Sequence, residues 1–182
     1  MEIAAIDLGI CAGYEYAGDA SRTAIVLPGA MLGGMPVNAY VVSALVDQGW
    51  RVIQVWDDYS VDVAREEWAI SRARAALDYA GEVRLLTAKS ITTHAAPLVS
   101  ERELAAIWLT PLLNRPECVE ALRARKAPAL LVGGTDDPTW SPAVAREISP
   151  DVLELDGADH GLAAIEHLQQ IVDSVTEFSA RL

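Results

Sequence analysis

The chain has 182 residues, of which 52% are apolar and 22% are charged. This length is typical of one domain, and the apolar content suffices for a buried core and excludes wholesale disorder. Asp and Glu outnumber Lys and Arg by 26 to 14, giving a formal net charge of −12. Because nucleic acids and anionic membranes attract clustered basic residues, this balance argues against binding to either. We expect a single domain over residues 1–182.

The sequence also bears on location. The opening segment MEIAAIDLGI contains Glu2 and Asp7 and no basic residue, which is unlike a secretory signal peptide. No stretch of about 18 uncharged apolar residues is present to span a bilayer. The two cysteines, Cys11 and Cys118, have the spacing of neither a disulfide framework nor a zinc site, and we interpret both as buried apolar side chains. We therefore expect a soluble cytoplasmic protein.

Short β-rich runs alternate with longer segments of helical period along the chain. The predicted strands are 23–27, 51–56, 83–87, 106–109, 128–132 and 151–155, with 13–18 as a further edge strand before them. Several of these runs are continuously apolar, which is typical of strands covered on both faces.

Three connecting segments have clear helical patterns. Their apolar stripes lie at 37–45, 63–77 and 162–175. For the second helix, Ser60 is the expected N-cap and Gly81 the expected stop. The alternating order predicts an α/β fold with a doubly wound, mainly parallel sheet of six or seven strands.

Side chains with catalytic potential follow three of the predicted strands. Ser90 comes after the strand at 83–87, an Asp136-Asp137 pair after 128–132, and His160 after 151–155. Ligands of open α/β sheets bind beyond the carboxyl ends of the strands. A serine needs a base to become a nucleophile, and a carboxylate can orient a histidine for that task. We expect these side chains to meet at one edge of the sheet.

Five motifs resemble the α/β-hydrolase superfamily, in its small branch without a lid, over about residues 22–180. They are a Pro-Gly loop at 27–29, a Lys-Ser elbow at 89–90, WLTPLL at 108–113, GTDDPTW at 134–140 and GADHG at 157–161. The order serine, acid, histidine is also that of the superfamily. The resemblance implies an α/β-hydrolase-like sheet in three layers without a cap domain.

Carried over residue by residue, the resemblance implies that Ser90 is the nucleophile, Asp137 the acid and His160 the base. Asp136 is the competing acid, although the superfamily's G-x-x-D pattern begins naturally at Gly134 and favours Asp137.

The resemblance also implies an oxyanion hole. One donor would be the backbone N–H of Ile91, and the second that of Ala30 or Met31.

The elbow departs from the superfamily's G-x-S-x-G pattern at two positions. Ala88 and Thr92 stand where the pattern has glycine. A β-branched threonine crowds a tight turn more than alanine does, so we expect a distorted elbow or a helix set farther from its strand. Both a competent and a silent elbow are compatible with this sequence.

The implied activity is hydrolysis of a small ester or thioester through an acyl-Ser90 intermediate, with no metal or organic cofactor. The alternative is a catalytically silent α/β-hydrolase-like binding domain. A Walker A loop is rejected because the required glycines are missing before Lys89-Ser90. An actin-like phosphate loop at Asp7-Leu8-Gly9 is weakly indicated, since the chain offers no second phosphate loop.

Overall fold

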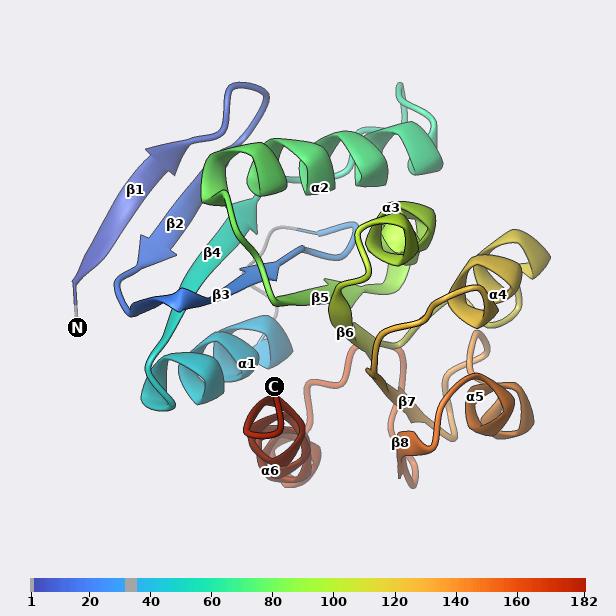
Figure 1. The fold of residues 1–182 in the computed structure, drawn as a ribbon. Helices are drawn as coiled ribbons and strands as arrows, with labels where there is room; N and C mark the ends of the chain where they lie inside the picture. The colour runs from blue at the N-terminus through green and yellow to red at the C-terminus, as the bar shows by residue number, and fades with distance from the viewer. Residues whose placement is uncertain (1, 32–35) are drawn as a thin grey trace.

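The computed structural model describes residues 2–31 and 36–182. One eight-stranded sheet runs through this part of the chain, in the spatial order β1-β2-β4-β3-β5-β6-β7-β8 (Figure 1). The strands are β1 (Ile3–Asp7), β2 (Ala12–Tyr16), β3 (Asp19–Val26), β4 (Trp50–Trp56), β5 (Leu85–Lys89), β6 (Ala105–Leu109), β7 (Ala129–Gly134) and β8 (Asp151–Leu155). Strands β3 to β8 pair in parallel, whereas β1 and β2 form an antiparallel hairpin at one edge.

Helices cover both faces of the sheet and complete three layers (Figure 1). They are α1 (Pro36–Asp47), α2 (Arg65–Ala80), the 3₁₀ helix η1 (Ser90–Ala95), α3 (Ala96–Glu101), α4 (Pro116–Arg123), α5 (Pro142–Ile148) and α6 (Ile165–Ser179). The apolar faces of α1 and α6 pack on one side of the sheet, and those of α2 to α5 on the other. Within residues 2–31 and 36–182, no cap domain is inserted between these elements.

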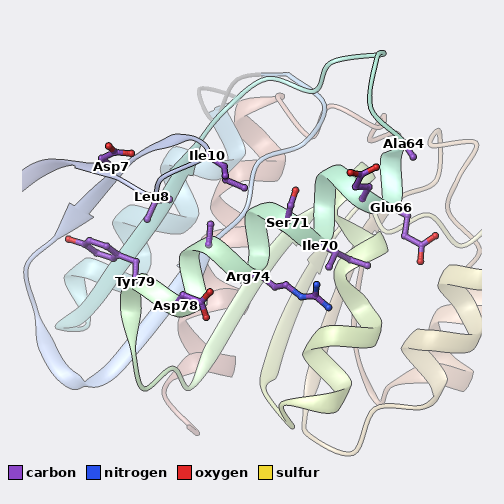
Figure 2. A pocket seen from close by; sticks show the side chains of 12 residues that line it. Asp7, Leu8, Ile10, Ala64, Glu66, Ile70, Ser71, Arg74, Asp78 and Tyr79 are labelled. Carbon is purple, nitrogen blue, oxygen red and sulfur yellow. The ribbon is translucent and has the colours of Figure 1, made fainter.

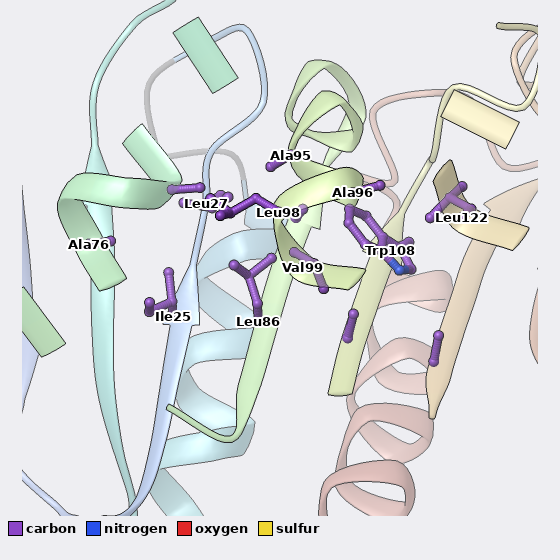
Figure 3. Packing of buried hydrophobic residues seen from close by; sticks show 14 of the residues in the cluster. Ile25, Leu27, Ala76, Leu86, Ala95, Ala96, Leu98, Val99, Trp108 and Leu122 are labelled. Atoms are coloured by element: carbon purple, nitrogen blue, oxygen red, sulfur yellow. The ribbon is translucent and has the colours of Figure 1, made fainter. Parts of the chain in front are cut away.

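Figure 3 shows the packing between the sheet and helices α2 to α5 from close by. Trp108 of β6 lies among helix residues such as Ala96 and Leu122, while Leu86 of β5 faces Val99. The continuously apolar strands predicted from sequence are therefore buried on both faces, as a parallel sheet requires.

The predicted doubly wound α/β fold is confirmed, but the predicted number of strands is too low. The missing strand is β1 (IAAID), which lies at the outer edge of the sheet and whose side chains are mostly exposed. Strand β5 begins and ends two residues later than predicted, so that it leads directly into Ser90.

Two predicted helix boundaries also need correction. Helix α2 begins at Arg65 after Ala64, whereas Ser60 bonds the N–H of Asp62 in the preceding turn. Gly81 does end this helix, with a φ of 78° that glycine adopts without strain. Leu162 lies before α6 and is buried in the core. Among the described residues, no helix combines the length and apolar character needed to cross a membrane.

Candidate active site

Ser90 occupies a sharp turn between β5 and η1. Its φ of 54° lies in the left-handed region, which non-glycine residues rarely adopt. The strand ends at Lys89 and the helix begins at Ser90 itself. A turn this abrupt projects the serine side chain beyond the carboxyl end of the sheet, as in a nucleophile elbow.

Three strand ends bring the predicted serine, histidine and aspartate together. Ser90 Oγ lies 2.7 Å from His160 Nε2, and His160 Nδ1 lies 2.8 Å from Asp137 Oδ2. Both distances are in the hydrogen-bonding range. The His160 side chain is 37% exposed while that of Asp137 is fully buried. The imidazole is thus partly open to solvent, while its Nδ1 atom lies against a buried carboxylate.

Asp137 is held as a carboxylate by its neighbours. Burial by itself would raise its pKa, but hydrogen bonds from His160 and from the backbone and side chain of Thr139 lower the pKa below its ordinary value. Both Thr139 donors lie 2.8 Å from Asp137 Oδ1. The competing acid, Asp136, is exposed, and its backbone N–H bonds the carbonyl oxygen of Ala158. The geometry therefore distinguishes two adjacent carboxylates that the sequence leaves in competition.

The glycine pair at the end of β7 allows the acid and histidine loops to meet. A Cβ atom on Gly133 would lie 2.1 Å from the ring of Trp140, and one on Gly134 would lie 2.0 Å from the carbonyl oxygen of Ala158. Neither distance is compatible with a side chain. The segment that contains Asp137 can therefore lie directly against the loop that contains His160.

Thr92 has a specific place in the elbow. Its hydroxyl oxygen accepts a hydrogen bond from the Lys89 N–H at 2.9 Å, and lies 2.9 Å from the carbonyl oxygens of Pro28 and Lys89. The side chain is fully buried. Thr92 thus links the elbow to the loop that follows β3. The helix after the elbow begins as a 3₁₀ turn, and Ala88 packs in the core.

Lys89 points into the protein beneath the site. Its Nζ donates to Thr110 Oγ1 at 3.0 Å and to the carbonyl oxygen of His160 at 2.7 Å. Burial lowers the pKa of Lys89 to about 8, against the opposing charges of Asp137 and Asp159. The lysine links the end of β5 to the histidine loop. Thr110 and Thr139 are not among the predicted site residues, although both lie in motifs that carry the resemblance, because a motif does not tell which of its side chains contact the site.

The predicted oxyanion donors come from two segments, η1 and the loop that follows β3. Ile91 follows Ser90 in η1 and is buried. Ala30 is exposed, and its carbonyl oxygen accepts a hydrogen bond from the Tyr59 N–H at 3.1 Å. Met31 is 67% exposed. The contact between Thr92 and Pro28 holds the start of this loop against the elbow.

A separate open groove of about 930 Å³ lies along the outer side of α2, beside the β1–β2 hairpin (Figure 2). Acidic side chains are prominent in it, and no residue of the Ser90–His160–Asp137 chain lines it. Its residues are Asp7, Leu8, Ile10, Ala64, Glu66, Glu67, Ile70, Ser71, Arg74, Ala75, Asp78 and Tyr79.

Comparison with solved structures identifies the fold. Est1E from Butyrivibrio proteoclasticus, with ferulic acid bound, superposes with a TM-score of 0.79 at 14% identity, covering 98% of each chain. A serine hydrolase without a lid from Xanthomonas campestris gives a TM-score of 0.75 at 15% identity, covering 99% of this chain and 94% of that one. The chain has the α/β-hydrolase fold.

A predicted hydrolase from Thermoplasma acidophilum shares this α/β-hydrolase fold at 17% identity, with a TM-score of 0.73 and coverage of 100% of this chain and 98% of that one. No protein-family model matches the sequence, and no curated protein gives a significant match. At these identities the comparisons establish the α/β-hydrolase fold, and the chemistry has to be argued from the site.

Proposed function

We propose that this protein is a serine hydrolase that cleaves a small ester or thioester. The observation that carries the proposal is the unbroken hydrogen-bond chain from Ser90 Oγ through His160 to Asp137. These three side chains are the nucleophile, base and orienting acid of an acyl-transfer site. The α/β-hydrolase fold supports the assignment, because it places such groups at the carboxyl edge of the sheet.

Acylation begins when Ser90 Oγ attacks the carbonyl carbon of the substrate. His160 Nε2 takes the hydroxyl proton, and Asp137 accepts a hydrogen bond from Nδ1–H and stabilises the imidazolium. Charge develops on the substrate oxygen, where the N–H of Ile91 and that of Ala30 or Met31 would bind it. The buried Asp137 carboxylate is suited to its task because hydrogen bonds already keep it ionised.

The remaining steps complete acylation and then remove the acyl group from Ser90. The tetrahedral intermediate expels its alcohol or thiol, which receives the proton from His160 Nε2, and an acyl-Ser90 ester remains. A water molecule then attacks the acyl carbon while His160 takes one of its protons. Collapse of the second intermediate releases the carboxylic acid and returns the proton to Ser90 Oγ.

The openness of the site supports a small substrate or a flexible acyl group. His160 is partly exposed, and the described part of the chain contains no inserted cap domain. The ferulic acid in the Est1E structure is a small carboxylic acid held by a protein of the same fold. We infer that the acyl group here is of comparable size, with few contacts to the leaving group.

A fluorophosphonate probe tests the proposal, because it reacts covalently with an activated serine. We expect labelling of the wild-type protein at Ser90, none in Ser90→Ala, and undiminished labelling in Ser60→Ala, which removes an exposed serine of a surface turn. A folded wild-type protein that is not labelled would instead support the alternative, a catalytically silent binding domain.

A further inference from the structure

Three side chains that the proposed reaction does not use converge between η1 and α4. His94 comes from η1, and Glu117 and Cys118 come from the first turn of α4. One ring nitrogen, one carboxylate oxygen and the sulfur lie within 4.8 Å of one another. Helix α2 packs against η1, and α3 against α4, so tertiary packing sets this arrangement. No short sequence motif reveals it, because the histidine and the cysteine lie on separate elements.

The distance between the two stronger ligands matches a metal site. Cys118 Sγ lies 3.6 Å from His94 Nδ1. In a tetrahedral zinc site, with Zn–S about 2.3 Å and Zn–N about 2.0–2.1 Å, the sulfur and nitrogen lie about 3.5–3.6 Å apart. The same separation suits a thiol–imidazole hydrogen bond, so a third ligand is what favours a metal.

Glu117 supplies that third ligand. It is exposed and, within the part of the chain that the structure describes, its carboxylate forms no hydrogen bond or ion pair. Its position and that of Cys118 at the start of α4 also suit anionic ligands, because the helix dipole stabilises negative charge there.

A second carboxylate acts on the cluster through its charge. Glu66, at the start of α2, raises the pKa of both His94 and Cys118 by its charge, although burial has the largest effect on each pKa. It also lines the groove of Figure 2. The positive charges of Arg65 and Arg115 act on His94 in the opposite sense. The charges of the two carboxylates and the two guanidinium groups roughly cancel. The chemistry of the ligand atoms therefore decides which cation would bind.

We propose that His94, Glu117 and Cys118 form a binding site for a soft divalent cation of the zinc class. The cation would bind to His94 Nδ1, a Glu117 oxygen and Cys118 Sγ, and the thiol proton would pass to solvent. Water would take the fourth position. Such a site would join the helix after the elbow to α4, and it does not depend on the proposed hydrolysis.

Cadmium and zinc titrations of the full chain, after treatment with a chelator, test this site. We expect Cd²⁺ to produce an ultraviolet sulfur-to-cadmium charge-transfer band that saturates at one ion per chain and is displaced by Zn²⁺. His94→Ala and Cys118→Ser should abolish the band. Glu117→Gln should weaken binding by about tenfold or more, since even groups that only support a ligand contribute about that much.

Matched controls separate this site from adventitious binding. Cys11→Ala and His167→Ala remove the same residue types elsewhere and should leave the band unchanged. In the wild-type protein, Zn²⁺ and not Mg²⁺ should raise the melting temperature, because only a ligand of the folded state stabilises it. The proposal is wrong if the wild-type protein shows neither the band nor the shift. It is equally wrong if the band survives in folded Cys118→Ser or disappears in Cys11→Ala.

Discussion

Two of the four non-glycine residues with positive φ in the described part of the chain directly follow strands at the candidate site. Ser90 and Thr110 both have positive φ values, of 54° and 42°, although neither is glycine. Thr110 is β-branched, which makes this conformation more costly. Each follows a strand of the central sheet, and Lys89 bonds the side chain of Thr110. The surrounding core holds both residues in place, which fixes the serine hydroxyl in front of the imidazole.

The two neighbouring aspartates give the most selective test of the acid assignment. Asp137→Asn preserves the shape of the side chain but removes the charge that stabilises the imidazolium. We expect the hydrolysis rate constant kcat to fall by about 10³–10⁴-fold. Asp136→Asn should leave kcat near the wild-type value, because that side chain is exposed. Steady-state kinetics with a p-nitrophenyl ester measure both, and equal losses would contradict the assignment.

Lys89 should act as a positioning residue for His160. Lys89→Met keeps the apolar stem but loses the ammonium group that bonds the His160 carbonyl oxygen. We expect kcat/KM to fall by about 10–100-fold, because small displacements of a catalytic group have effects of this size. Lys126→Met, at an exposed lysine in a surface ion pair, is the matched control and should have no effect.

The pH dependence of stability provides a second readout for Lys89. Its pKa is about 8 in the folded protein and about 10.4 when unperturbed, so the unfolded chain binds more protons between these values. The free energy of unfolding should therefore rise in the wild-type protein as pH increases from about 8 to 10. Denaturant titrations should show that Lys89→Met lacks this contribution while Lys126→Met retains it. An identical rise in all three proteins would contradict the buried position of the ammonium group.

At the scale of elements, the end of β7 sets the distance between the acid and the histidine. Gly134→Ala would place a Cβ atom 2.0 Å from the Ala158 carbonyl oxygen. We expect a loss of about 1–3 kcal/mol in the free energy of unfolding, together with a loss of activity as the His160 loop shifts. Gly81→Ala is the control, since its positive φ lies at the end of α2, away from the site.

Gly81→Ala should also lower stability, by about 1 kcal/mol, but keep the wild-type kcat/KM. Denaturant titration and ester kinetics on both variants separate the two effects. Full activity in Gly134→Ala would show that the glycine pair does not control the geometry of the site.

Elements with a local signal are the ones that can be predicted from this sequence. The apolar runs identified the parallel strands, and the residues that follow them included Ser90, Asp137 and His160. The exposed edge strand β1 and the start of α2 were not predicted correctly. Ser60 is a residue type that often caps helices, but it lies in the turn before α2. Contacts such as Lys89 to the His160 carbonyl oxygen depend on loop conformation, which no spacing along the chain encodes.

On the scale of the whole molecule, we propose that the chain behaves as one domain. A single sheet connects all eight strands, and the two main apolar clusters lie on its opposite faces. Buried tryptophans report on each cluster, with Trp108 in one, Trp50 in the second and Trp68 in a smaller third. Removal of either face would expose the same strands, so we expect both to unfold together.

Coincident unfolding curves test this expectation. In urea, the transitions followed by far-ultraviolet circular dichroism and by tryptophan fluorescence should share one midpoint and one slope. Two separated transitions would show that the β1–β2 edge or one helical layer is an independent unit.

The most direct test of the proposed hydrolase chemistry is a pre-steady-state measurement with p-nitrophenyl acetate. The proposed acyl-Ser90 intermediate predicts a burst of one equivalent of p-nitrophenol per chain whenever deacylation is slower than acylation. Mass spectrometry of quenched protein should then find the acetyl group on the peptide that contains Ser90, and Ser90→Ala should show neither burst nor adduct. The proposed acyl-Ser90 mechanism would be contradicted if the folded wild-type protein shows neither an acetyl adduct nor hydrolysis. It would also be contradicted if Ser90→Ala hydrolyses the ester as fast as the wild-type protein.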